Sequence, residues 1–176
     1  NRVRNQLGLY NIEETTDHEA EPVTVAVLDS GIDSRHPDLE GKVLAFQDFI
    51  ANRNIPYDDY GHGTHVCGSI AGSGTISDGL YAGIMPDARL VIGKILDKHG
   101  DGNVEKMAAA MHWVMEIKDT YNIRVLNISV GIGEPDDKDR ILEVVSLLEA
   151  VWQAGIVVVC AAGNAGPGNG TISPLG

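Results

Sequence analysis

The chain has 176 residues, 43% of them hydrophobic and 22% charged, which is enough for one globular domain with a substantial buried core. Its 25 acidic and 13 basic side chains give a formal net charge of -12, and a field of that sign repels phosphate backbones and anionic membrane surfaces. No apolar run approaches the roughly 20 residues that a membrane-spanning helix needs. We therefore expect neither nucleic acid nor a membrane to be a partner of this protein.

Four apolar runs rich in β-branched residues predict strands, and segments that predict helices lie between them. The predicted strands are residues 23–28, 89–96, 123–128 and 156–161. Such alternation predicts an α/β fold in which helices cover both faces of a parallel β-sheet. The segments 30–60 and 73–88 are rich in Gly, Asp, Asn and Pro, which predicts loops at the strand ends.

Three helices are expected between these strands. Small residues within 61–74 predict a short helix that packs tightly against the sheet, with His65 facing the interior. Apolar residues recur at helical spacing over about residues 104–118, and Asn103 is placed to cap that helix. The third helix spans about residues 137–153 and opens with acidic residues, which favour the start of a helix.

Cys67 and Cys160 are the two cysteines of the chain, and each stands among apolar or small residues. Two cysteines do not make a disulfide framework, so we predict buried free thiols. Cys67 lies five positions from His62, a separation that points two side chains of one helix in diverging directions, so packing is favoured over a nucleophilic role. Sparing use of cysteine is compatible with a secreted or a cytoplasmic protein, and the compartment stays open.

Polar residues stand at or just past the ends of three predicted strands: Asp29, Ser129 and Asn164. In open parallel sheets, ligands bind beyond the carboxyl ends of the strands, so these side chains are expected at one rim. Backbone amides of the turn after Asp29 are available to keep its carboxylate ionised. The alternative for Asp29 is an aspartate that only caps a loop.

His62 stands between two glycines at an expected helix start, where its ring is free to project, and this suits a general base. The alternatives are a structural histidine and a metal site shared with His65, for which no third ligand lies nearby in the sequence. Asn164 carries a neutral amide donor of the kind that stabilises an oxyanion. Its alternative is a plain turn.

Four segments, in this order, resemble the motifs of the subtilisin-like serine proteases, the subtilase family. They are Asp29-Ser30-Gly31-Ile32-Asp33, Gly61-His62-Gly63-Thr64-His65-Val66, Leu126-Asn127-Ile128-Ser129-Val130-Gly131 and Ala161-Ala162-Gly163-Asn164. The resemblance covers nearly the whole chain from about residue 22 and implies a subtilisin-like fold. It also implies a serine endopeptidase that hydrolyses peptide bonds in proteins and needs no cofactor for its chemistry. In that family pattern Asp29 orients the imidazole, His62 is the general base and acid, and Asn164 donates to the oxyanion.

The resemblance also implies where a peptide substrate binds. Its extended chain would lie between two edge segments, Gly100-Asp101-Gly102 and Ser129-Val130-Gly131, although a plain turn before a helix is the alternative for the first. The second segment, together with Ala162 and Gly163, would wall the pocket for the residue before the cleaved bond, with Ser173 near the pocket floor. None of these wall and floor residues is charged, which predicts a preference for neutral, apolar or aromatic side chains.

Asp38 matches a position that binds calcium in the family, which makes it a candidate ligand for a structural calcium ion. The partner loop, residues 74–83, departs in length from the best-known members. Oxygen-rich loops suit hard cations, and the alternative is a solvated acidic loop. A chelator that lowers the melting temperature would support the calcium site.

The family's nucleophilic serine follows the oxyanion asparagine at the start of a helix, and these 176 residues do not contain that motif. None of Ser30, Ser69, Ser73 and Ser129 stands at a suitable helix start. We therefore expect residues 1–176 to be a single partial peptidase domain that is inactive alone. It would have an N-terminal arm over residues 1–21 and an α/β core over 22–176 that is incomplete at its C-terminal side.

The expected partners are a protein or peptide substrate and the remaining C-terminal part of the same domain. A noncatalytic, peptide-binding subtilase relative is the alternative function. Nucleotide binding at the glycine-rich stretch 163–170 is disfavoured, because no helix is expected to follow those glycines and the chain is strongly acidic.

Overall fold

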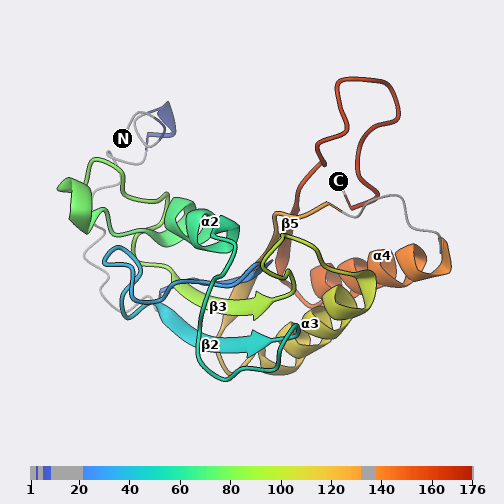
Figure 1. Cartoon of the computed structure of the whole chain (residues 1–176), viewed down its shortest axis with the longest axis horizontal. Helices are drawn as coiled ribbons and strands as arrows, with labels where there is room; N and C mark the ends of the chain where they lie inside the picture. Colours follow the sequence, from blue (N-terminus) through green and yellow to red (C-terminus); the bar gives the residue numbers. More distant parts are fainter. Residues whose placement is uncertain (1–2, 4–5, 9–21, 132–137, 176) are drawn as a thin grey trace.

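The computed structural model describes residues 3, 6–8, 22–131 and 138–175. Five strands form one parallel sheet in the order β2-β3-β1-β4-β5 (Figure 1). The strands are β1 Thr24–Asp29, β2 Val43–Asp48, β3 Arg89–Lys94, β4 Ile123–Ile128 and β5 Val157–Cys160. The helices are α2 His62–Ala71, α3 Val104–Ile117 and α4 Lys138–Gln153, with a single 3-10 turn at Thr75–Ser77. The predicted α/β class with a parallel sheet is confirmed.

Alternate residues of the central strand β1 face two separate cores. Val25 and Val27 pack with Cys67 and other residues of α2, and Ala26 and Leu28 pack with the buried residues of α3 and α4. Helix α2 therefore covers one face of the sheet while α3 and α4 cover the other (Figure 1). All six residues of β1 are buried, so this strand holds its last residue in a fixed place.

The four predicted strands and three predicted helices are present, with ends that differ by a few residues. The side chain of Asn103 accepts a hydrogen bond from the amide of Lys106, which confirms the predicted cap of α3. The third helix is described from Lys138, and its predicted first residue lies outside the described residues. The predicted N-terminal arm, residues 1–21, is described only at Val3 and residues 6–8.

Strand β2 corrects the prediction that residues 30–60 are loops. Val43–Asp48 pairs with β3 at one edge of the sheet and is mostly half-buried. An edge strand needs no long apolar run, and this one stands among Gly, Asp and Asn residues that ordinarily mark loops. The partner that makes it a strand is β3, more than 40 residues further along the chain.

At the other edge, β5 pairs only with β4 in the described structure, and Val157 and Val159 are exposed by 49% and 47%. Trp152 at the end of α4 is also exposed, beside this edge. None of the helices that the structure describes is long and apolar enough to cross a membrane.

Asp48, at the end of β2, fastens the loop that leads to α2. Its carboxylate accepts hydrogen bonds from the amides of Ile50, Ala51 and Arg53 and from the hydroxyl of Tyr57. Burial acts to raise the pKa of Asp48, but these donors outweigh burial and hold the pKa below its ordinary value. Burial, followed by the bond to Asp48, raises the pKa of Tyr57 to about 12.

We expect Asp48→Asn to destabilise the protein at neutral pH by about 2 kcal/mol, because hydrogen bonds to an ionised group are lost. A carboxyl group whose pKa is lowered by folding stabilises above its unfolded pKa of about 3.9 and loses that contribution as the pH falls through the folded pKa. The difference between the wild type and Asp48→Asn should therefore shrink below about pH 4. Melting curves between about pH 2 and pH 7 measure this, with Asp119→Asn as the exposed control. A difference independent of pH would contradict the argument.

Candidate active site

The fold brings the two predicted acid and base residues into direct contact. Asp29 is the last residue of β1 and is fully buried, and His62 is the first residue of α2, with its side chain 41% exposed. His62 Nδ1 lies 2.8 Å from Asp29 Oδ1 and 3.0 Å from Oδ2. The amide of Ser30 donates to Asp29 Oδ1 at 2.7 Å, as the turn after the strand predicts. Asp29 is thus held on one side by its own turn and on the other by the imidazole.

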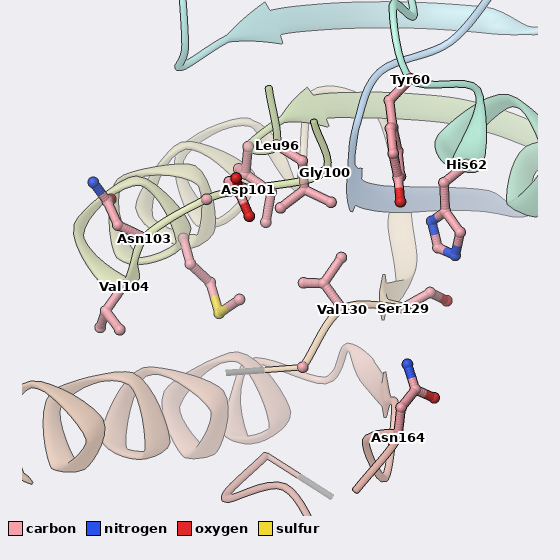
Figure 2. A pocket seen from close by; sticks show the side chains of 14 residues that line it. Tyr60, His62, Leu96, Gly100, Asp101, Asn103, Val104, Ser129, Val130 and Asn164 are labelled. Carbon is pink, nitrogen blue, oxygen red and sulfur yellow. The ribbon is translucent and has the colours of Figure 1, made fainter. Parts of the chain in front are cut away.

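A cleft of about 530 Å³ opens beside His62 (Figure 2). Segments from three places in the sequence border it: the loop between β3 and α3, the residues after β4, and the loop after β5. The predicted residues that line it are Gly100, Asp101, Gly102, Ser129, Val130, Gly131 and Asn164. The amide end of Asn164 points from below toward Ser129 and the opening (Figure 2). The structure therefore brings both predicted edge segments, the predicted amide donor and His62 to one cleft.

The remaining predicted substrate residues lie beside this cleft, outside its lining. The Ser173 amide donates to the carbonyl of Ala162 at 2.7 Å, and a Cβ on Gly163 would lie 3.2 Å from Ser173 Cβ. A Cβ on Gly131 would lie 3.9 Å from Gly163 Cα, so the segments after β4 and β5 are neighbours. Ser173 is buried and adjoins Gly163, in line with a place at the back of a pocket. Its role as pocket floor stays a prediction.

Tyr60 belongs to the cleft and was not predicted from the sequence. Its ring centroid lies 6.5 Å from that of His62, and it lines the cleft with half of its surface exposed. The ring also rests on Gly100, where a Cβ would come within 2.7 Å of Tyr60 Cζ and where φ is +84°. Tyr60 therefore joins the wall at His62 to the edge segment at Gly100. An aromatic residue two positions before the histidine was the available signal.

Lys94 was also missed, since a lysine at the end of a strand ordinarily reaches solvent. It is fully buried, and its Nζ donates to the carbonyls of Ser30 and Leu96 and to Asp59 Oδ1 at 2.5, 2.8 and 2.6 Å. Buried charges persist where they are paired and hydrogen-bonded, as this one is. Lys94 thereby ties the turn after Asp29 to the strand end that begins the cleft wall.

The structure corrects one prediction made from the histidine motif. His65 was expected to face the interior, but it is exposed on α2, because only Gly63, Cys67 and Ala71 of this helix are buried. These small residues, four positions apart along the helix, form the face that meets the sheet. In the described part of the chain, no group of three His, Cys, Asp or Glu side chains is placed to hold a metal ion.

Both cysteines are free thiols in the structure. Cys67 is fully buried as predicted, and burial, followed by the charges of Asp29 and Asp58, raises its pKa far above the ordinary value. It is therefore a neutral packing group at neutral pH. Cys160 is only half-buried, short of the full burial that was predicted, and partial burial raises its pKa as well.

Asp38 lies where its carboxylate meets protein donors. Its Oδ1 accepts from the amide of Ile76 at 3.1 Å and from the hydroxyl of Ser73 at 3.5 Å. Calcium takes about six to eight oxygen ligands, whereas Oδ1 of Asp38 faces hydrogen-bond donors. No part of the chemistry is assigned to a calcium ion, and the site at Asp38 stays a prediction that a chelator would test.

Comparison with known proteins agrees with the geometry. The model of the subtilase family matches residues 20–176. The serine protease AprX of Bacillus subtilis (strain 168) is 41% identical over 159 residues, which cover 88% of this chain and 36% of that protein. The intracellular serine protease of Paenibacillus polymyxa is 36% identical over 158 residues, covering 88% of this chain and 45% of that one.

Solved structures give the same result. A psychrophilic protease superposes with a TM-score of 0.72 at 30% identity, over 86% of this chain and 48% of that chain. A cold-adapted subtilisin-like serine proteinase gives a TM-score of 0.66 at 28% identity, over 81% and 47%. The chain thus spans less than half the length of these relatives. With its sheet, its motifs and its matches over nearly the whole length in agreement, the chain belongs to the subtilase family.

Proposed function

We propose that this chain supplies the aspartate, the histidine and one oxyanion donor of a serine endopeptidase. The observation that carries the proposal is the contact of His62 Nδ1 with both oxygens of Asp29, 2.8 and 3.0 Å away, at the rim of a cleft. A buried carboxylate in contact with a half-exposed imidazole is the arrangement of a general base that is held and oriented from behind. Serine proteases among the relatives support the same reaction class.

Each residue then has one task. A carboxylate accepts hydrogen bonds, so Asp29 keeps the proton of the neutral ring on Nδ1 and leaves the Nε2 lone pair facing away from the strand. Nε2 takes the proton of a serine hydroxyl as that oxygen attacks the peptide carbonyl, and then gives it to the leaving amine. The amide of Asn164 donates to the oxyanion that forms at the carbonyl oxygen. These steps require no cofactor.

A peptide substrate would lie extended between the two edge segments that line the cleft. Glycine at Gly100, Gly102 and Gly131 allows a backbone to approach closely, which strand pairing with a peptide requires. The segments after β4 and β5 adjoin each other and, with Ser173, carry no charge. We therefore expect neutral, apolar or aromatic side chains before the cleaved bond.

The nucleophilic serine is proposed to lie outside these 176 residues. Among the described serines near the site, Ser30 Oγ donates to Asp58, and Ser129 Oγ accepts from the side chain of Asn127 at 2.8 Å. On α2, the hydroxyl of Ser69 donates to the carbonyl of His65. Within the described residues, no serine hydroxyl is hydrogen-bonded to the ring of His62. Residues 1–176 alone should therefore not hydrolyse peptides.

The whole protein and the isolated chain are compared in a panel of peptides that differ in the residue before the cleaved bond. We expect the whole protein to hydrolyse peptides with neutral residues there, His62→Ala to lose this activity, and residues 1–176 to show none. A preference for Lys, Arg or Asp at that position would overturn the pocket assignment. Binding without hydrolysis by the whole protein would support the noncatalytic, peptide-binding alternative.

A further inference from the structure

Asp58 bonds to both segments that carry the catalytic pair and contacts neither Asp29 nor His62 through its side chain. It lies in the loop before α2, four residues before His62, and its carboxylate is half-buried. Its Oδ1 accepts from Ser30 Oγ at 2.9 Å and from the amides of Gly61 and Tyr60 at 2.7 and 3.2 Å. The first of these donors follows Asp29 in the chain, and the second precedes His62.

The second carboxylate oxygen of Asp58 also accepts hydrogen bonds. Oδ2 of Asp58 accepts from the amide of Thr64 at 2.9 Å and from the hydroxyl of Thr64 at 2.6 Å. These donors lie in the first turn of α2, whose amides need acceptors outside the helix, and the N-cap residue Gly61 has no side chain to offer one. A carboxylate at this end of a helix is also favoured by the helix dipole. Asp58 therefore fixes the turn of the helix that starts with His62.

Two further bonds close the link between β1 and α2. Ser30 Oγ, which donates to Asp58, accepts from the amide of Gly63 at 2.9 Å, and the hydroxyl of Thr64 accepts from the amide of Asp33. The approach is close, because a Cβ on Gly63 would come within 2.3 Å of the Gly31 carbonyl oxygen. The turn after Asp29 and the start of α2 are thus in contact, and Asp58 spans both.

The charge of Asp58 agrees with this role. Burial acts to raise the pKa of Asp58, but the hydroxyl of Thr64, the amides of Gly61 and Thr64 and the hydroxyl of Ser30 outweigh it and hold the pKa below its ordinary value. The group is therefore ionised at neutral pH and serves as an acceptor on both oxygens.

We propose that Asp58 is a positioning residue that sets the distance and angle between Asp29 and His62. It acts through the Ser30 hydroxyl on one side and through Gly61 and Thr64 on the other. Only the expected effect on the rate rests on the proposed function, because the geometry of Asp29 and His62 can be measured without turnover. A displacement of about 1 Å in such a pair can cost about 10²-fold in rate.

The test replaces Asp58 with Asn in the whole protein. One carboxylate oxygen becomes an NH₂ group, which donates and therefore cannot accept from the amides and hydroxyls that face it. Two readouts are followed: steady-state kinetics on a cleaved peptide, and the low-field proton NMR signal of His62 Nδ1–H hydrogen-bonded to Asp29. We expect kcat to fall about 10²-fold, because His62 is no longer aligned with Asp29. KM should change little, because the cleft that binds the peptide keeps its shape. The NMR signal should shift or broaden.

Asp48→Asn is the matched control, because Asp48 is likewise a carboxylate that accepts several hydrogen bonds from the protein, yet its side chain bonds to neither Ser30 nor α2. It should lower the melting temperature and leave kcat and the NMR signal near those of the wild type. If Asp58→Asn does not fold, two milder variants replace it. Ser30→Ala removes the hydrogen bond from the Ser30 hydroxyl to Asp58, and Thr64→Val removes the one from the Thr64 hydroxyl. A loss in kcat and a changed signal in these milder variants support the proposal.

The proposal is overturned if Asp58→Asn, or both milder variants, lose stability as Asp48→Asn does and keep kcat and the His62 signal of the wild type. Asp58 would then be only a structural group. A wild-type protein that hydrolyses no peptide contradicts the proposed function instead, and the NMR signal of His62 alone then decides the role of Asp58.

Discussion

Asp29→Asn should lower kcat of the whole protein by about 10⁴-fold, the effect that the same change at the triad aspartate has in a serine protease of a different fold. In the structure, the two oxygens of Asp29 lie 2.8 and 3.0 Å from His62 Nδ1, and both are acceptors. An asparagine would turn an NH₂ group toward that nitrogen. The ring would then keep its proton on Nε2, where it cannot receive the proton of a serine. Steady-state kinetics on a cleaved peptide measure the loss.

Asp33→Asn is the control, because Asp33 lies four residues further along the same turn and pairs with Arg35 at the surface. An exposed ion pair of this kind contributes little, so kcat should stay within about twofold of the wild type. In the Asp29→Asn variant the side-chain oxygen of the new amide can still accept from the amide of Ser30, so the fold should persist. Similar kcat values for the two variants would remove Asp29 from the mechanism.

Asn164→Ala should lower kcat by about 10²- to 10³-fold with KM nearly unchanged, a magnitude that comes from subtilisin, itself a relative of this chain. The reason is that an oxyanion donor acts on charge that exists only in the transition state. Asn164 is exposed and lines the cleft with His62 and Ser129, so its loss leaves no buried group unsatisfied. Stability should therefore change little.

Asn169→Ala tests whether any exposed asparagine of the same loop matters, and it should behave as the wild type. The kinetic constants separate two roles for Asn164. A fall in kcat alone supports oxyanion stabilisation, whereas a rise in KM at constant kcat would show that Asn164 only binds the ground state of the substrate.

The sequence predicted those helices and strands whose own residues carry the pattern that forms them. Strand β1 is apolar throughout most of its length and buried throughout, and α3 carries both its apolar face and its cap within the same stretch. Strand β2 was missed because it is formed by its pairing with β3 rather than by its own composition. His65 was misplaced for a related reason. The small residues that let α2 approach the sheet define its buried face, and they turn His65 outward.

In the candidate site, too, some residues could be predicted from their own segment and others could not. The contact of Asp29 with His62 could be expected, because a strand end and a helix start meet at the rim of a parallel sheet. Tyr60, Lys94 and Asp58 could not be read in the same way, since their roles depend on which loops meet across the cleft. A carboxylate that precedes a helix start is an ordinary capping signal. That it also bonds to the turn after β1 appears only in three dimensions.

The most direct measurement is the reaction of the whole protein with a fluorophosphonate, followed by identification of the modified residue by mass spectrometry. We predict one modified serine outside residues 1–176, and we expect Asp29→Asn and His62→Ala to slow the modification greatly. Modification of a serine within residues 1–176, or a rate that is the same in His62→Ala and the wild type, would contradict the claim that Asp29 and His62 activate the nucleophile of a serine peptidase.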